Sequence, residues 1–227
     1  MNLVKVGGVC AILTVVVWVV AIIFMLASGV EEDPYKIEAY LRDAHNNAFY
    51  LSSAALVVVV MAFLIPAVLG FYQALQRAGR LLWPALAFAL IGVSMVFMAL
   101  MLTLGELTQL VPGYAEADAA LKPALAVVES TVLVSISWMW SLGVFLSLGI
   151  GGVLFSIGVL RTSVIARWIG WLGVAAGVLM VFFPLALVWD VLVMAPFVPF
   201  VLSMAWLVAM GVSLLRLREP VASATGS

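Results

Sequence analysis

A few acidic, amide and imidazole side chains border long apolar runs, where they could bind a ligand. The candidate set for a polar pocket is His45, Glu106, Gln109, Glu129 and Asp190. Carboxylates next to an apolar layer cost free energy unless they face a bundle interior or a wet cavity, so this set could hold a cation or a polar small molecule. The competing interpretation is a group of interfacial acids wetted by water on the outer face of a membrane.

Glu129 has the longest apolar flanks of these acids. Ala-Val-Val precedes it and Val-Leu-Val follows within five residues, so we predict that helix packing buries its side chain. Lys122 lies two turns away on the same helix face, about 10 Å along the axis, which is too far for a direct ion pair. A cationic partner would therefore have to be Lys36 or Arg42, and such a contact would join two outer helices over the bundle.

Catalytic and cofactor chemistry finds little support in the sequence. The chain has one histidine and one cysteine, Cys10, which excludes a Cys/His metal cluster and a bis-histidine haem. It contains neither a Ser/His/Asp set nor a phosphate-binding loop. We therefore predict a non-catalytic protein without a cofactor, apart from bound lipid. The net charge of −1 argues against nucleic-acid binding, which needs clustered Lys and Arg.

The elements that position these residues are membrane helices. Hydrophobic residues make up 67% of the 227 residues and charged residues 9%, whereas a soluble domain has about a quarter charged residues. Most of the surface must therefore face lipid. The fold class predicted is an all-α polytopic membrane protein, a bundle of six transmembrane helices with two short outer interfacial helices. Residues 1–215 form this single bundle, and residues 216–227 are predicted to be a cytoplasmic polar tail.

Apolar runs and turn residues give the predicted boundaries. The transmembrane helices are expected at 6–29, 51–75, 81–104, from Trp138 to about 159, 168–189, and in a last span ending near 215. A short amphipathic helix is expected within 30–50, a turn at 111–114, and a second outer helix at 116–136. An unbroken helix over 115–159 would be about 67 Å long, twice the hydrocarbon thickness, so it must either break or project from the membrane. We place the break near residue 137, and an outer helix that extends the fourth span stays open as the alternative.

The distribution of basic residues predicts the orientation. Seven of the ten Lys and Arg residues fall at one side of the predicted bundle: Lys5, Arg77, Arg80, Arg161, Arg167, Arg216 and Arg218. Basic residues concentrate in cytoplasmic loops, so both termini are predicted to be cytoplasmic. We expect a multi-pass protein of the plasma or bacterial inner membrane.

One stretch of the chain resembles a known family. A glycine-rich helix ends in a small-polar and basic turn, and ARWI and GWLG then open the next helix; the residues concerned are Arg161, Ser163, Ala166, Arg167, Trp168, Gly170, Trp171 and Gly173. This pattern resembles an uncharacterised prokaryotic family of integral membrane proteins, domain of unknown function 4386. The resemblance implies six helices and supplies no catalytic residues.

Small residues form a candidate helix-packing interface in the same region. Gly173 and Gly177 form a GxxxG pattern, and Ser147, Gly151 and Gly152 extend a small-residue seam on the preceding helix. Small residues let membrane helices approach closely. Two interpretations remain open, an interface with another subunit or contact between the fourth and fifth helices of one chain.

Two functional classes follow from these features. The first is a non-catalytic structural or accessory subunit of a membrane assembly, whose partners are lipids and either copies of itself or other membrane subunits. The alternative is a protein that binds or transports a small molecule or ion through the outer polar pocket. The apolar helix centres count against a transporter, which usually carries polar groups at mid-membrane.

Overall fold

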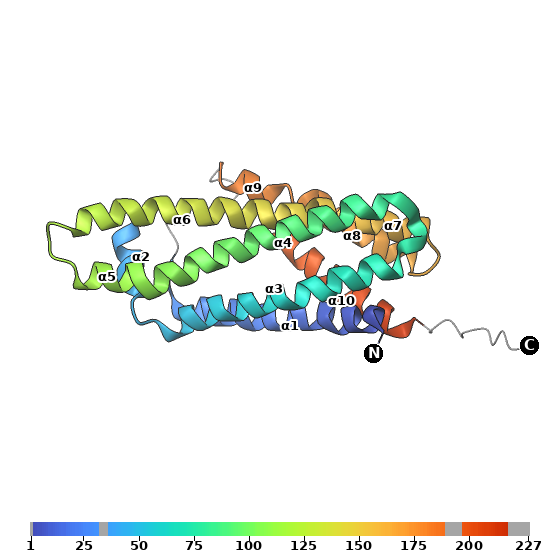
Figure 1. Ribbon diagram of the computed structural model, residues 1–227, viewed down its shortest axis with the longest axis horizontal. Helices are drawn as coiled ribbons and strands as arrows, with labels where there is room; N and C mark the ends of the chain where they lie inside the picture. Colours follow the sequence, from blue (N-terminus) through green and yellow to red (C-terminus); the bar gives the residue numbers. More distant parts are fainter. Residues whose placement is uncertain (1, 32–35, 189–196, 218–227) are drawn as a thin grey trace, which may run out of the picture.

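In the part of the chain that the structure describes, six helical spans run along the long axis of the molecule (Figure 1). The computed structural model describes residues 2–31, 36–188 and 197–217, and its regular elements in these ranges are all helical. The spans long and apolar enough to cross a membrane are Leu3–Ser28, Ala48–Ala74, Gln76–Glu116, Lys122–Arg161, Arg167–Ala186 and Phe197–Arg216. The predicted all-α, polytopic membrane fold is confirmed.

Helix α1 (Leu3–Ser28) packs between α3 (Ala48–Ala74) and α10 (Phe197–Arg216). The contacts are close because glycines face each other. A Cβ on Gly7 would lie 2.6 Å from the Cα of Gly70, and one on Gly8 would lie 2.8 Å from the carbonyl oxygen of Gly211. The start of α1 therefore meets the end of α10, so both lie at the same end of the bundle.

Two spans are much longer than a membrane requires. Helix α4 (Leu82–Gly105) continues through the π-helical turn η2 (Glu106–Leu110) into α5 (Val111–Glu116). Helix α6 (Lys122–Val144) continues through a second π-helical turn, η3 (Phe145–Gly151), into α7 (Gly152–Arg161). These two helical runs, 82–116 and 122–161, contain 35 and 40 residues, or about 52 and 60 Å, well above the ~30 Å hydrocarbon thickness. Together they project beyond α1 and α3 (Figure 1).

This projection corrects two expectations. The separate outer helix at 116–136 and the break near 137 are wrong, because α6 runs unbroken through Trp138. The turn expected at 111–114 is also wrong, because these residues belong to α5, which continues the helical run with Pro112 near its start. The prediction chose the break over the projecting helix that it had left open. Instead, α4–α5 and α6 leave the bundle side by side and pack against each other.

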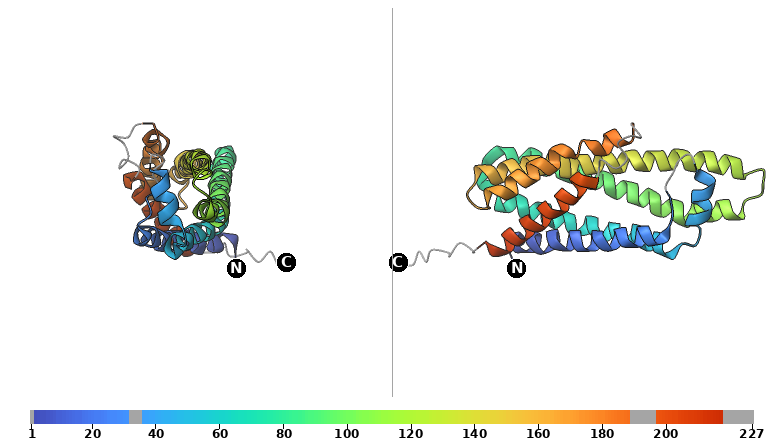
Figure 2. Two further views of the ribbon diagram at one scale, coloured as in Figure 1. Left: turned by 90° about the vertical axis from the view of Figure 1, so that its left-hand side faces the viewer. Right: turned by 180° about the vertical axis from the view of Figure 1, so that it is seen from behind.

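Helix α2 (Ile37–Ala44) lies across the projecting end and contacts α5 and α6 (Figure 2). Its buried face consists of Tyr40, Leu41 and Ala44, as the spacing of its apolar residues predicted. These side chains form a small hydrophobic cluster with Tyr50 of α3 and Val111 of α5. The cluster is separate from the main core of the bundle, so α2 encloses its own buried space.

The opposite end of the bundle has short connections. The 3-10 helix η1 (Gln76–Leu81) joins α3 to α4, and α8 (Arg167–Leu179) packs on α7 and α10. The fifth span was expected as one helix over 168–189. It breaks after α8, and a short helix α9 (Phe182–Ala186) follows. Pro184 lies in that helix and has no N–H to donate to the preceding turn, which favours the break.

Candidate functional site

A pair of carboxyl groups is buried under α2. Glu106 comes from η2 and Glu129 from α6, and their side chains are 4% and 0% exposed. The two carboxyl groups lie close enough to interact electrostatically. Three of their four oxygens, Oε2 of Glu106 and both of Glu129, have no hydrogen-bond partner among the described residues. The predicted burial of Glu129 is therefore confirmed.

Two tyrosines complete this buried polar cluster. The hydroxyl of Tyr40 donates a hydrogen bond to Oε1 of Glu106. The hydroxyl of Tyr50 lies 3.5 Å from that of Tyr40, and the two rings meet edge to face. Both tyrosines are almost fully buried. The sequence analysis did not select them, although the position of Tyr40 on the apolar stripe of α2 indicated that its ring faces inward.

Glu106 lies at the junction of α4 and the π-helical turn η2. Its N–H reaches the carbonyl oxygens of Leu102 and Thr103, so Glu106 keeps the register of α4. The π-helical bond follows it, from the N–H of Val111 to the carbonyl oxygen of Glu106. A π-helical turn shifts the side chains after it relative to a continuous α-helix and often marks a functional site.

The basic residues at this end of the molecule have other partners. Nζ of Lys36 lies 3.1 Å from Glu31, Nε of Arg42 lies 2.9 Å from Asp43, and Nζ of Lys122 lies 5.3 Å from the ring centre of Tyr114. The hydrogen bond from Arg42 to Asp43 raises the pKa of the Arg42 guanidinium. The contact predicted between Glu129 and Lys36 or Arg42 is therefore wrong.

The rest of the predicted polar pocket does not assemble around the two glutamates. Nε2 of His45 lies 2.8 Å from the amide nitrogen of Asn46, and Gln109 is exposed on η2. Asp190 lies outside the described residues. The structure thus brings together Glu106 and Glu129 from the predicted set and adds Tyr40 and Tyr50.

A pocket of about 320 Å³ lies next to this polar cluster, between the two halves of the bundle. Helices α1, α3, α4 and α6 and the segment after α9 line it. The lining residues are Trp18, Ala21, Ile22, Met25, Tyr50, Ser53, Ala54, Val57, Leu100, Thr103, Ile136, Ser137, Trp140, Ser141 and Leu187. Most of these side chains are apolar, so the pocket suits an apolar molecule.

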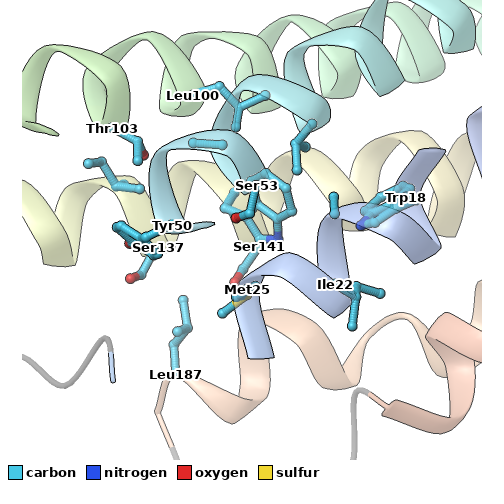
Figure 3. Close-up of a pocket in the computed structure, with 15 residues that line it drawn as sticks. Trp18, Ile22, Met25, Tyr50, Ser53, Leu100, Thr103, Ser137, Ser141 and Leu187 are labelled. Carbon is cyan, nitrogen blue, oxygen red and sulfur yellow. The ribbon is translucent and has the colours of Figure 1, made fainter. Parts of the chain in front are cut away.

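Hydroxyl groups are concentrated in one part of the pocket. Figure 3 shows Tyr50 and Ser137 at one end, Ser53 and Ser141 in the middle, and Trp18 with Ile22 at the other end. Met25 and Leu187 are 41% and 38% exposed, so the pocket reaches the apolar surface of the bundle beside them. Tyr50 belongs both to the pocket and to the polar cluster around Glu106 and therefore connects the two.

The small-residue seam lies between helices of this chain. A Cβ on Gly173 would collide with Oγ of Ser156 and the indole nitrogen of Trp206, and one on Gly177 would lie 2.6 Å from Val153. Gly151 packs against Ala89 of α4, and Ser147 donates a 2.8 Å hydrogen bond to the carbonyl of Gly143. A Cβ on Gly152 would meet open space. The contact of α8 with α7, η3 and α10 therefore accounts for Gly173 and Gly177, and the contact of η3 with α4 accounts for Ser147 and Gly151.

These features define a polytopic helical membrane protein with a buried carboxyl pair beside an apolar pocket. The chain belongs to the family described as Domain of unknown function (DUF4386), whose family model matches residues 6–214. The resemblance noted around residues 158–181 is thereby confirmed. Neither the curated proteins nor the solved structures contain a match to the chain.

Proposed function

We propose that this protein binds a small, largely apolar molecule in the pocket between α1, α3, α4 and α6. The pocket itself is the observation that carries the proposal, because its volume of about 320 Å³ lies at the lower end of the ~300–1,000 Å³ typical of small-molecule sites. Well-packed protein interiors leave few voids larger than a water molecule, so a space of this size favours an occupant.

The lining indicates the class of molecule. Trp18, Trp140 and aliphatic side chains would enclose an apolar body, and the hydroxyls of Tyr50, Ser53 and Ser141 could bond a polar group. Met25 and Leu187 place the entrance on the apolar surface, so a lipid-soluble ligand could enter from the bilayer. An amphipathic molecule with one small polar group fits these features best. Binding is the proposed function, and no chemical conversion of the ligand is proposed.

A pocket-filling variant tests this proposal. Ala54 is 7% exposed and lines the pocket, so Ala54→Phe should occupy part of the space; Val59 of the same helix is 41% exposed and provides the matched control Val59→Phe. Native mass spectrometry after extraction in mild detergent should show a small bound molecule on the wild-type protein and on Val59→Phe. Ala54→Phe should lose it while keeping the same thermal unfolding midpoint within a few degrees.

The outcome against the proposal is equally specific. A wild-type protein without any bound small molecule, or the same bound molecule on Ala54→Phe, would refute binding at this pocket. Ser141→Leu fills the pocket from α6 and serves as a second variant if Ala54→Phe does not fold.

A non-catalytic structural or accessory role in a membrane assembly is the second candidate. The scarcity of reactive side chains supports it. The small-residue seam lends it no support, because Gly173 and Gly177 pack inside this chain. The same native mass measurement separates the candidates, since an accessory subunit should retain a second protein chain, or a second copy of itself, whether or not the pocket is filled.

A further inference from the structure

The proposed ligand does not use the carboxyl pair, because neither Glu106 nor Glu129 lines the pocket. Both side chains are buried under α2, where uncharged residues would pack at a lower free-energy cost. Burying an ionised carboxylate without a counter-charge is strongly unfavourable. A carboxyl pair at this position is therefore neutralised either by protons or by a bound cation.

The four carboxyl oxygens of Glu106 and Glu129 differ in their hydrogen bonding. Oε1 of Glu106 accepts the hydrogen bond from Tyr40, and the other three carboxyl oxygens are buried and unpaired. The side chain of Glu129 is fully buried and lies within interaction range of the Glu106 carboxyl group, and no donor group of the other described residues binds its two oxygens. Two carboxyl groups in contact cannot both stay ionised unless a cation lies between them.

We propose that Glu106 and Glu129 bind one monovalent metal cation, with Na⁺ as the probe, in exchange for a proton. With two protons the pair is neutral. Replacing one proton by Na⁺ keeps it neutral, and the released proton passes to water. Carboxylate oxygens suit hard cations, and the unpaired oxygens of both residues would contact the ion. The site is separate from the ligand pocket, so the two proposals can fail independently.

The surroundings favour a monovalent over a divalent ion. Ca²⁺ takes about six to eight oxygen ligands, and Mg²⁺ requires a nearly octahedral set. Residues 2–31, 36–188 and 197–217 contain no group of three or more His, Cys, Asp or Glu side chains that could hold a metal. Two carboxyl groups and the neighbouring tyrosine hydroxyls supply fewer oxygen ligands than Ca²⁺ or Mg²⁺ takes. One monovalent ion and one proton balance the two negative charges of this set.

Among the described residues, the elements packed around the pair carry several other titratable groups. Helix α2 contributes Tyr40 and α3 contributes Tyr50, while α5 contributes Tyr114, whose ring lies under Lys122 of α6. Arg42 and Lys36 bind Asp43 and Glu31. Glu106 and Glu129 are the buried carboxyl groups of the described residues, so the proposal attributes the pH dependence of cation binding to them.

The test is thermal unfolding of the purified full-length protein in detergent. NaCl is compared with N-methyl-D-glucamine chloride at equal ionic strength, which removes general salt effects. A ligand that binds only the folded state raises the midpoint, so Na⁺ should raise it by about 2–5 °C at ~pH 8. The rise should shrink at ~pH 5.5, because protons then compete for the same oxygens.

Three variants assign the effect to the pair. Glu106→Gln and Glu129→Gln should each abolish the Na⁺-dependent rise, whereas Glu116→Gln, which removes an exposed acid from α5, should keep it. Direct binding of ²²Na⁺ to the wild-type protein, one ion per chain, is the second measurement and needs no variant. The proposal is overturned if Na⁺ neither binds nor stabilises the wild-type protein at any pH tested, or if the rise persists in both Gln variants.

Discussion

Tyr40 donates a hydrogen bond from a short surface helix to Glu106 in a membrane span. This bond crosses 66 positions of the sequence and lies where water has little access, since both side chains are almost fully buried. A buried acceptor that loses its donor costs about 1–3 kcal/mol. The position of α2 and the arrangement of the carboxyl pair are therefore energetically connected.

Tyr40→Phe tests that connection. The substitution keeps the ring but removes the hydroxyl, so the unfolding midpoint should fall by about 2–8 °C at neutral pH. Tyr114→Phe is the control, because its ring would keep the contact with Lys122. Circular dichroism melting of both proteins in detergent provides the measurement. A Tyr40→Phe midpoint equal to that of the control would argue against an energetic role for this bond.

Single residues differ in how far their surroundings can be predicted. The apolar flanks of Glu129 indicated its burial, because a carboxyl group within such a run must pack against protein or face lipid. Glu106 was selected as a polar residue, but its partner could not be inferred. A π-helical turn shifts the helical register locally, and the residues Glu106–Leu110 show no pattern that predicts such a turn.

At the scale of helices, close approach between α8 and its neighbours holds the fifth span in the bundle. Gly173 leaves no room for a Cβ beside Ser156 and Trp206, whereas Gly152 faces open space. The two glycines share one predicted seam and differ in their structural surroundings. Sequence alone could not separate them, because the difference depends on which helix faces each residue.

Gly173→Ala should therefore destabilise the protein by about 1–3 kcal/mol, the usual cost of overpacking. Gly152→Ala, made in parallel, should be neutral or stabilise by up to about 1 kcal/mol, since alanine favours helix over glycine. Purification yield and unfolding midpoint report both effects. Equal loss in the two variants would contradict the packing described for Gly173.

Helix boundaries were predictable where turn residues and basic residues coincide, as at the connections before α4 and α8. They were not predictable at the projecting end. The length of an apolar helix was compared with the thickness of a bilayer, and that comparison assumes that a helix ends where the lipid ends. Helices α5 and α6 extend past this limit because α2 and each other cover one side of each helix there.

At the scale of the whole molecule, the start of α1 and the end of α10 meet at one end, with the basic connections before α4 and α8. Helix α2, α5 and the start of α6 occupy the opposite end (Figure 1). The even number of spans and the basic residues favour a cytoplasmic location for the first end. This orientation stays a prediction.

Cysteine labelling of intact cells tests the orientation. In a Cys10→Ala background, Glu116→Cys at the end of α5 should react with a membrane-impermeant maleimide, whereas Gln76→Cys in η1 should react only after the cells are opened. Both positions are exposed. The reverse labelling pattern would place the termini outside.

The projection of α4 beyond the bundle has an electrical consequence for the carboxyl pair. The 24 residues of α4 separate Glu106 from the basic connection, a distance of about 36 Å, which exceeds the ~30 Å hydrocarbon layer. Moving one charge across the whole membrane costs about 2.3 kcal/mol per 100 mV. A cation entering at the α2 end would cross only a small part of that voltage drop, so its occupancy would follow ion concentration and pH rather than the membrane potential.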